Sequence, residues 1–168
     1  MKLNEIFDHE PEDLRWVSAG NRHTATFTLS SDVFSLVIDE YDLELPRGKV
    51  SVADVTFAKN GKTEKSTTTE KFHALGGINT ALINKIKQLR PAVVSYGALS
   101  DIPRRKKVYT HWALMFSRGS SYTYQSPWFK YANGEHMFIS KFEPSVEDMT
   151  VIKEFFASIP EKENPGTI

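Results

Sequence analysis

The sequence has no cysteine, no long apolar run and no excess of one charge. The absence of cysteine among its 168 residues excludes disulfides, thiolate nucleophiles and cysteine-ligated zinc sites. No apolar stretch approaches the roughly 18 residues of a membrane-spanning helix. The opening stretch MKLNEIFDHEPEDL is acidic and has no apolar core of a secretory signal. We therefore expect an intracellular protein that has no contact with membranes.

The charges balance, with 21 Lys and Arg against 21 Asp and Glu, so no overall field attracts nucleic acid. One local patch, Arg104–Lys107, could grip phosphates, and the aromatic side chains between Tyr122 and Tyr131 could stack bases. Cations in a first helical turn oppose the helix dipole, however, and usually form a solvated face. Nucleic-acid binding is therefore not expected. The five histidines show no metal-ligand spacing, and we predict no metal site.

Apolar periodicity predicts a chain of strands interrupted by helices. Period-two alternation predicts strands, and spacing of three and four predicts helices. In chain order we expect a turn at Gly20-Asn21, strands at 23–29, 33–41 and 49–59, a helix that begins at Ile78 and ends before Pro91, a strand at 92–96, a helix from Pro103 to Gly119, strands at 121–125 and 136–141, and a last helix from Ser145.

Particular residues set the ends of these helices. Pro91 disfavours helical geometry at Arg90 and so ends the first helix. In the second helix, Val108, Trp112 and Met115 form one apolar stripe. Ser145 followed by Asp148 three residues later is a candidate capping box for the last helix.

The third strand has a break in its apolar phase. Val50 and Val52 share one parity, whereas Val55 and Phe57 take the other. A β-bulge at residues 52–54 would bring all four to one face. Alternatively, both faces of the strand are buried and there is no bulge.

A helix between two strands indicates a crossover, and hence a parallel strand pair. The fold class that we predict is α+β: a single domain, residues 1–168, with a mixed, mainly antiparallel sheet, a central parallel pair and helices on its faces. Residues 1–20 form a short segment with a helical turn near Glu12–Trp16, and residues 160–168 are expected to be a mobile tail.

Two features are candidate functional residues. Gly76 and Gly77 precede the first predicted helix, where free amides could bind phosphate; the alternative is a plain turn into a helix. Tyr109 could donate a proton to a leaving group; the alternative is a tyrosine that packs beside Trp112 or Ala113 and whose hydroxyl reaches water.

The order of predicted elements over residues 23–141 resembles the GNAT (general N-acetyltransferase) family. The segment RPAVVSYGALSDIPRRKKVYTHWALMF further resembles small bacteriophage proteins of that fold, which carry an arginine and a tyrosine on the helix after the strand. Arg105 and Tyr109 match that pair and lie four residues apart, on one helical face.

This resemblance implies an acetyl-coenzyme A site and an N-acyltransferase whose acceptor is an amine of a small molecule or a protein. The pyrophosphate would bind the amides of Gly76, Gly77, Ile78 and Asn79. The pantetheine arm would pair with the strand near Val52 and Val55, and Arg105 would help to bind the cofactor. Tyr109 would protonate the departing thiolate.

The chain also departs from the family pattern. The family's phosphate motif is Arg or Gln, two residues, Gly, one residue, then Gly or Ala. With Gly76 as its first glycine, His73 and Ile78 occupy the outer positions, and with Gly77 the outer residues are Ala74 and Asn79. An alternative therefore stays open beside the acyltransferase: a GNAT-shaped protein without catalysis that binds a phage or host protein through residues 122–131. In either case the expected location is the host cytoplasm or the virion.

Overall fold

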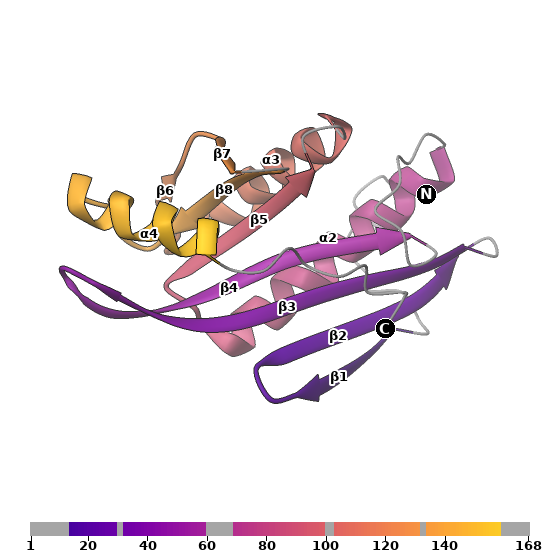
Figure 1. Ribbon diagram of the computed structural model, residues 1–168. Helices are drawn as coiled ribbons and strands as arrows, with labels where there is room; N and C mark the ends of the chain where they lie inside the picture. Colours follow the sequence, from indigo (N-terminus) through magenta and orange to yellow (C-terminus); the bar gives the residue numbers. More distant parts are fainter. Residues whose placement is uncertain (1–13, 30–31, 60–68, 100–102, 132–133, 159–168) are drawn as a thin grey trace. The chain divides into compact units, whose positions relative to one another are not determined.

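The computed structural model describes residues 14–29, 32–59, 69–99, 103–131 and 134–158. Within these ranges the fold is α+β, with three helices and a mixed sheet that contains a parallel pair, which confirms the predicted class at this level (Figure 1). The strands are β1 (Arg15–Ala19), β2 (Arg22–Leu29), β3 (Asp32–Leu45), β4 (Gly48–Lys59), β5 (Val93–Leu99), β6 (Tyr124–Gln125), β7 (Phe129–Tyr131) and β8 (Gly134–Ser140). Their hydrogen-bonded order is β1-β2-β3-β4-β5-β8-β6, and β7 also pairs with β8.

The described residues fall into two compact units. The first contains the residues up to Ile38 and those from Phe57 to Arg90; the second contains Asp39–Thr56 and the residues from Pro91 onward. Strands β3 and β4 run through both units, so this division does not test the prediction of a single domain. The predicted tail, residues 160–168, lies outside the described residues, as do residues 1–13.

In the first unit, β1 and β2 form an antiparallel hairpin through the predicted turn at Gly20-Asn21. Gly20 has φ +61°, a conformation that glycine adopts without steric cost. The helical turn predicted near Glu12–Trp16 is wrong from Arg15 onward, because Trp16 lies in β1 and pairs with Ala25. Cross-strand hydrogen bonds and the strand preference of Trp and Val outweigh a single helical turn at this position.

Helix α2 (Thr69–Leu89) also belongs to the first unit, and it begins nine residues before the predicted start at Ile78. The residues that precede the glycine pair, TEKFHAL, include Glu, Lys, Ala and Leu, which all favour helices. Each glycine costs about 1 kcal/mol relative to alanine inside a helix, and a 21-residue helix tolerates that cost. The predicted end is confirmed: Leu89 is the last helical residue, and Arg90 leaves the helix with φ 54° before Pro91.

The second unit is centred on the parallel pair of β4 and β5. Its register runs without a skip from Val52–Val93 to Val55–Tyr96. Residues 52–55 are all buried, which confirms the alternative in which both faces of this strand are covered. On its side facing β5 the strand has no bulge.

Helices cover both faces of this part of the sheet (Figure 1). Helix α4 (Val146–Ser158) packs Ile152 and Phe156 into an apolar cluster with Val52, Val93 and Phe138. Helix α3 (Pro103–Ser117) lies on the opposite face, where Tyr96 contacts it. Successive residues of a strand point to opposite faces, so alternate side chains of β5 pack against α4 on one face and against α3 on the other.

Strands β6 and β7 replace the single strand that the sequence predicts at 121–125. Tyr124 pairs with Ser140, whereas Phe129 pairs with His136. The six residues 124–129 therefore match the five residues 136–140, which defines a one-residue β-bulge around Pro127. The prediction missed β7 because proline and the bulge interrupt the alternation of apolar residues.

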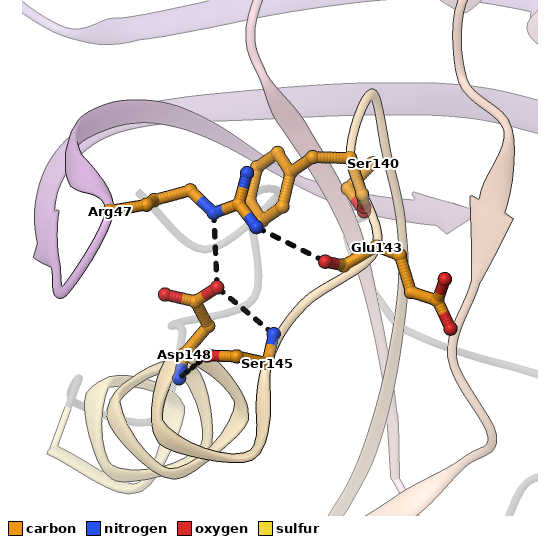
Figure 2. A network of polar contacts seen from close by, with 6 residues as sticks. Arg47, Ser140, Glu143, Ser145 and Asp148 are labelled. Atoms are coloured by element: carbon orange, nitrogen blue, oxygen red, sulfur yellow. Dashed lines mark hydrogen bonds and ion pairs between the residues drawn. The ribbon is translucent and has the colours of Figure 1, made fainter.

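The predicted capping box at the start of α4 is confirmed (Figure 2). The amide of Asp148 donates to the hydroxyl of Ser145 at 3.0 Å, and the amide of Ser145 donates to Oδ2 of Asp148 at 3.0 Å. The guanidinium of Arg47, in the turn between β3 and β4, donates to the same Oδ2 at 3.0 Å and to the carbonyl of Glu143 at 3.1 Å. One arginine thereby joins the β3–β4 turn to the start of the last helix.

Candidate functional site

Tyr109 lies on the inner face of α3 and is almost completely buried, with 1% of its surface exposed. Its ring centroid is 5.3 Å from that of Tyr96 on β5 and 5.7 Å from that of Trp112, which meets it edge-on. The packing against Trp112 is the one expected for a structural tyrosine, but the burial is deeper than expected for a hydroxyl that reaches water. A general acid must touch the group that it protonates, so this conformation keeps Tyr109 from an external thiolate.

The tyrosines around Tyr109 form a neutral, buried group. Burial raises the pKa of Tyr96 far above its usual value, and the neighbouring Tyr109 and Tyr122 raise it further. Burial also raises the pKa of Tyr122 to about 12. The hydroxyl of Tyr122 donates a hydrogen bond to the carbonyl of Pro91, just before β5. These contacts give the tyrosines a role in fixing α3 and the following segment to β5.

Val52 and Val55, expected along a pantetheine arm, lie inside the sheet with 1% and 0% of their surface exposed. Both are in register with β5 on one side, and β3 is the hydrogen-bonded neighbour of β4 on the other. A strand between two partners has its amides engaged in the ladder. A pantetheine arm could pair with residues 52–55 only by displacing a neighbouring strand.

The glycine pair does not open a helix, which corrects the premise of the predicted phosphate site. Gly76, Gly77, Ile78 and Asn79 lie in the interior of α2, because that helix starts at Thr69. Interior amides donate to carbonyls four residues earlier, and only the first four amides of a helix are free for an anion. In this conformation the four residues do not offer phosphate the amides that the resemblance implied.

The structure brings together only part of the predicted set. Val55 pairs with Tyr96, which contacts Tyr109, so these three lie on one face of the second unit. Gly76–Asn79 belong to the first unit. Arg105 lies in the first turn of α3, and its side chain is outside the described part of the structure.

Sequence reasoning missed a buried polar pair on the other face of the sheet. The hydroxyl of Ser95 on β5 donates to Oδ1 of Asp54 on β4 at 2.7 Å, and the two residues are 0% and 2% exposed. Asp39 on β3 is also buried, whereas Asp42 and Glu44 on the same strand are exposed. A single polar residue inside each apolar run, VADV and VVSYG, was the available signal. The bond between Asp54 and Ser95 joins the two parallel strands from within the core.

His136 on β8 is held between aromatic rings on the same face as Asp54. It stacks on Phe156 at a centroid distance of 5.0 Å and on Phe129 at 6.3 Å. Gly97 lies directly opposite it on β5, where a Cβ atom would come within 2.9 Å of Nε2 of His136. The glycine therefore makes room for the imidazole, and the histidine fills the space that a side chain would occupy.

A second polar cluster joins α3 to the bulge between β6 and β7. The indole of Trp128 donates to the hydroxyl of Thr110 at 3.0 Å. The ammonium of Lys106 lies 2.9 Å from a carboxylate oxygen of Glu135 and 5.3 Å from the centre of the Trp128 ring. These contacts hold Trp128 against α3. In the segment that was expected to form an interface, Tyr122 is buried, and Tyr124, Trp128 and Phe129 are half-buried.

Comparisons with protein-family models, with curated proteins and with solved structures find no match for this chain. Among the described residues, no cluster of three or more His, Asp or Glu side chains could hold a metal ion. None of the described helices combines the length and apolar character needed to span a membrane.

Proposed function

We propose that this protein is a phage-encoded protein with a GNAT-like fold that acts by binding a protein partner, of the phage or of its host, without acyl transfer. It would act in the host cytoplasm or as part of the virion. The GNAT-like assignment is supported by the order of strands and helices, in which the parallel pair of β4 and β5 is joined through α2.

The proposal that the protein lacks catalysis is based on one observation: residues that match an acyl-coenzyme A site are occupied by contacts within the fold. Val52 and Val55 are engaged within the sheet, and Tyr109 is enclosed by aromatic rings. The residues Gly76–Asn79 lie inside α2 rather than at its start. Apart from Arg105, whose side chain lies outside the described part of the structure, the residues that should meet the cofactor are already used by the fold itself.

Acetyl-coenzyme A-dependent N-acyltransfer is the second candidate. It is favoured by the parallel pair of β4 and β5, which the crossover helix α2 connects, and by the contacts that lead from Val55 through Tyr96 to Tyr109. For this function the protein would have to open, because Tyr109 must reach the thiolate that it protonates.

Thermal unfolding with and without acetyl-coenzyme A decides between the two candidates. A ligand at 100 times its Kd stabilises a fold by about 2.7 kcal/mol, which for a chain of this size raises Tm by about 5 to 11 °C. We expect no change in Tm with acetyl-coenzyme A or free coenzyme A at about 1 mM, a concentration at which a micromolar cofactor would be saturating. A rise with both, and none with ADP as a nucleotide control, would refute the non-catalytic proposal.

A further inference from the structure

The outer face of α3 combines exposed apolar and cationic side chains. Its exposed residues in the described part of the helix and just after it are Lys107, His111, Leu114, Met115 and Arg118. Their spacing of four, three, one and three residues places them on one side of the helix. We refer to these five residues as the α3 stripe.

The centre of the α3 stripe is apolar. Leu114 and Met115 are 44% and 43% exposed, and Met115 departs from the apolar stripe predicted with Trp112, which is buried at 3%. Single exposed apolar residues need no explanation. Here, however, two large ones are adjacent and flanked by Lys107 and Arg118, and an apolar centre within a charged rim is the usual anatomy of a protein interface.

The charge of α3 has one sign. The segment from Pro103 to Arg118 contains Arg104, Arg105, Lys106, Lys107, His111 and Arg118 and has no Asp or Glu. Lys106 is paired with Glu135. Within the described residues, Lys107 and Arg118 form no ion pair.

The cations in the first turn do not stabilise α3, because they oppose its dipole. The ion pair with Glu135 gives a reason for Lys106, but no ion pair of the described residues offsets the exposed charges of Lys107 and Arg118, in a protein whose net charge is zero. A partner that carries the opposite charge would explain them, because complementary charges steer association and fix its orientation.

We propose that the α3 stripe is a docking surface for an acidic amphipathic helix of a partner protein, whose apolar residues would cover Leu114 and Met115 while its carboxylates face Lys107 and Arg118. This proposal rests on the protein-binding function proposed above. Single-stranded nucleic acid fits less well, because its bases are held by stacking on aromatic rings and the aromatic residues of α3 face inward: Tyr109, Trp112 and Phe116 are 1%, 3% and 5% exposed.

The test uses a fluorescent peptide of roughly 20 residues, long enough to form a helix, made of Glu, Ala and Leu with the leucines along one side. Fluorescence anisotropy of the peptide reports its binding to the full-length protein. A peptide of the same composition in scrambled order is the control for charge alone. We expect the helical peptide to bind more tightly than the scrambled one, and hydrogen exchange to slow in α3 but not in α4.

Two pairs of substitutions test the surface itself. Lys107→Glu with Arg118→Glu, and separately Leu114→Ser with Met115→Ser, should each weaken peptide binding by about tenfold or more. Matched controls are Lys87→Glu on α2 and Val146→Ser on α4, since both residues are exposed elsewhere. The controls should leave peptide binding unchanged. All of these side chains are exposed, and a Tm close to that of the parent verifies the fold of each variant.

The proposal is overturned if the helical peptide fails to bind, if it binds no better than the scrambled peptide, or if neither pair of substitutions weakens it. If a DNA duplex binds more tightly than the helical peptide, and the Lys107→Glu, Arg118→Glu variant loses that binding, the partner of this surface is nucleic acid and the proposal of a protein helix is wrong. These results are separate from the coenzyme A experiment. If the peptide fails to bind and coenzyme A does not bind either, only the docking surface on α3 is refuted. If both the peptide and coenzyme A bind, the non-catalytic function is refuted and the docking surface is retained.

Discussion

Asp148 offers the most direct test of how the second unit is held together. Its carboxylate accepts hydrogen bonds from the amide of Ser145 and the guanidinium of Arg47, each at 3.0 Å (Figure 2). The side chain of Asp148 is 2% exposed and that of Arg47 is 39% exposed. Replacing Asp148 with alanine removes both bonds, and it leaves the first turn of α4 with only the half of its capping box that Ser145 accepts.

The expected loss of stability in Asp148→Ala can be estimated from these two hydrogen bonds. Loss of a helix cap costs typically about 1 kcal/mol. An ion pair with a partly exposed partner contributes at most about 1 kcal/mol after screening by solvent, and burial of Asp148 adds to the cost of an arginine left without its partner. We expect Asp148→Ala to lower the free energy of unfolding by about 2 to 3 kcal/mol. Asp148→Asn keeps an oxygen for the amide of Ser145 and should lose about 1 kcal/mol less.

The same carboxylate makes stability depend on pH. Burial acts to raise the pKa of Asp148, but the amide of Ser145, the guanidinium of Arg47 and the hydroxyl of Ser145 outweigh it and hold the pKa below its ordinary value of 3.8. A carboxyl with a lowered pKa in the folded state contributes stability that is fully present above the unfolded value. That contribution is lost as the pH falls through the lower, folded value. The Asn variant should therefore lose less stability than the parent when acidified below pH 3.8.

Urea unfolding at neutral and acidic pH measures both effects. The matched control is Glu147→Ala, because Glu147 is an exposed acid in the same first turn and takes no part in the capping box. The control should cost less than about 1 kcal/mol, the contribution of one charge to the helix dipole. If Asp148→Ala is no more costly than Glu147→Ala, or if the Asn variant and the parent respond equally to acid, the capping box does not stabilise this unit as argued.

Two further substitutions test the sheet around β5. Gly97→Ala places a Cβ against His136, whose ring is held between two aromatic side chains, and the crowding should cost about 1 to 3 kcal/mol in urea unfolding; a loss below about 0.5 kcal/mol would mean that the ring is free to move. Tyr122→Phe removes the buried hydrogen bond to Pro91 and should cost about 1 kcal/mol. Burial raises the pKa of Tyr122 to about 12 in the folded state, so the stability contributed by its neutral hydroxyl is complete below pH 10 and is lost as the pH rises toward 12. An ultraviolet titration in which every tyrosine ionises near pH 10 would contradict this expectation.

Local signals in the sequence determined much of the fold. The capping box at Ser145, the turn at Gly20-Asn21 and the helix stop before Pro91 each depend on residues a few positions apart, and such short-range preferences act without help from the rest of the chain. The crossover between β4 and β5 followed from a helix placed between two strands. The coarse fold class therefore required no knowledge of long-range contacts.

Tertiary structure decided the rest. Whether α2 starts at Thr69 or at the glycine pair depends on small propensity differences that packing easily overrides. The bond between Asp54 and Ser95 joins residues 41 positions apart, and the bulge near Pro127 is visible only from its register with β8. The burial of Tyr109 likewise depends on Tyr96 across the interface with β5. A sequence states which side chains are present and their local preferences, but the surroundings that make a phenol reactive or inert are assembled from distant strands.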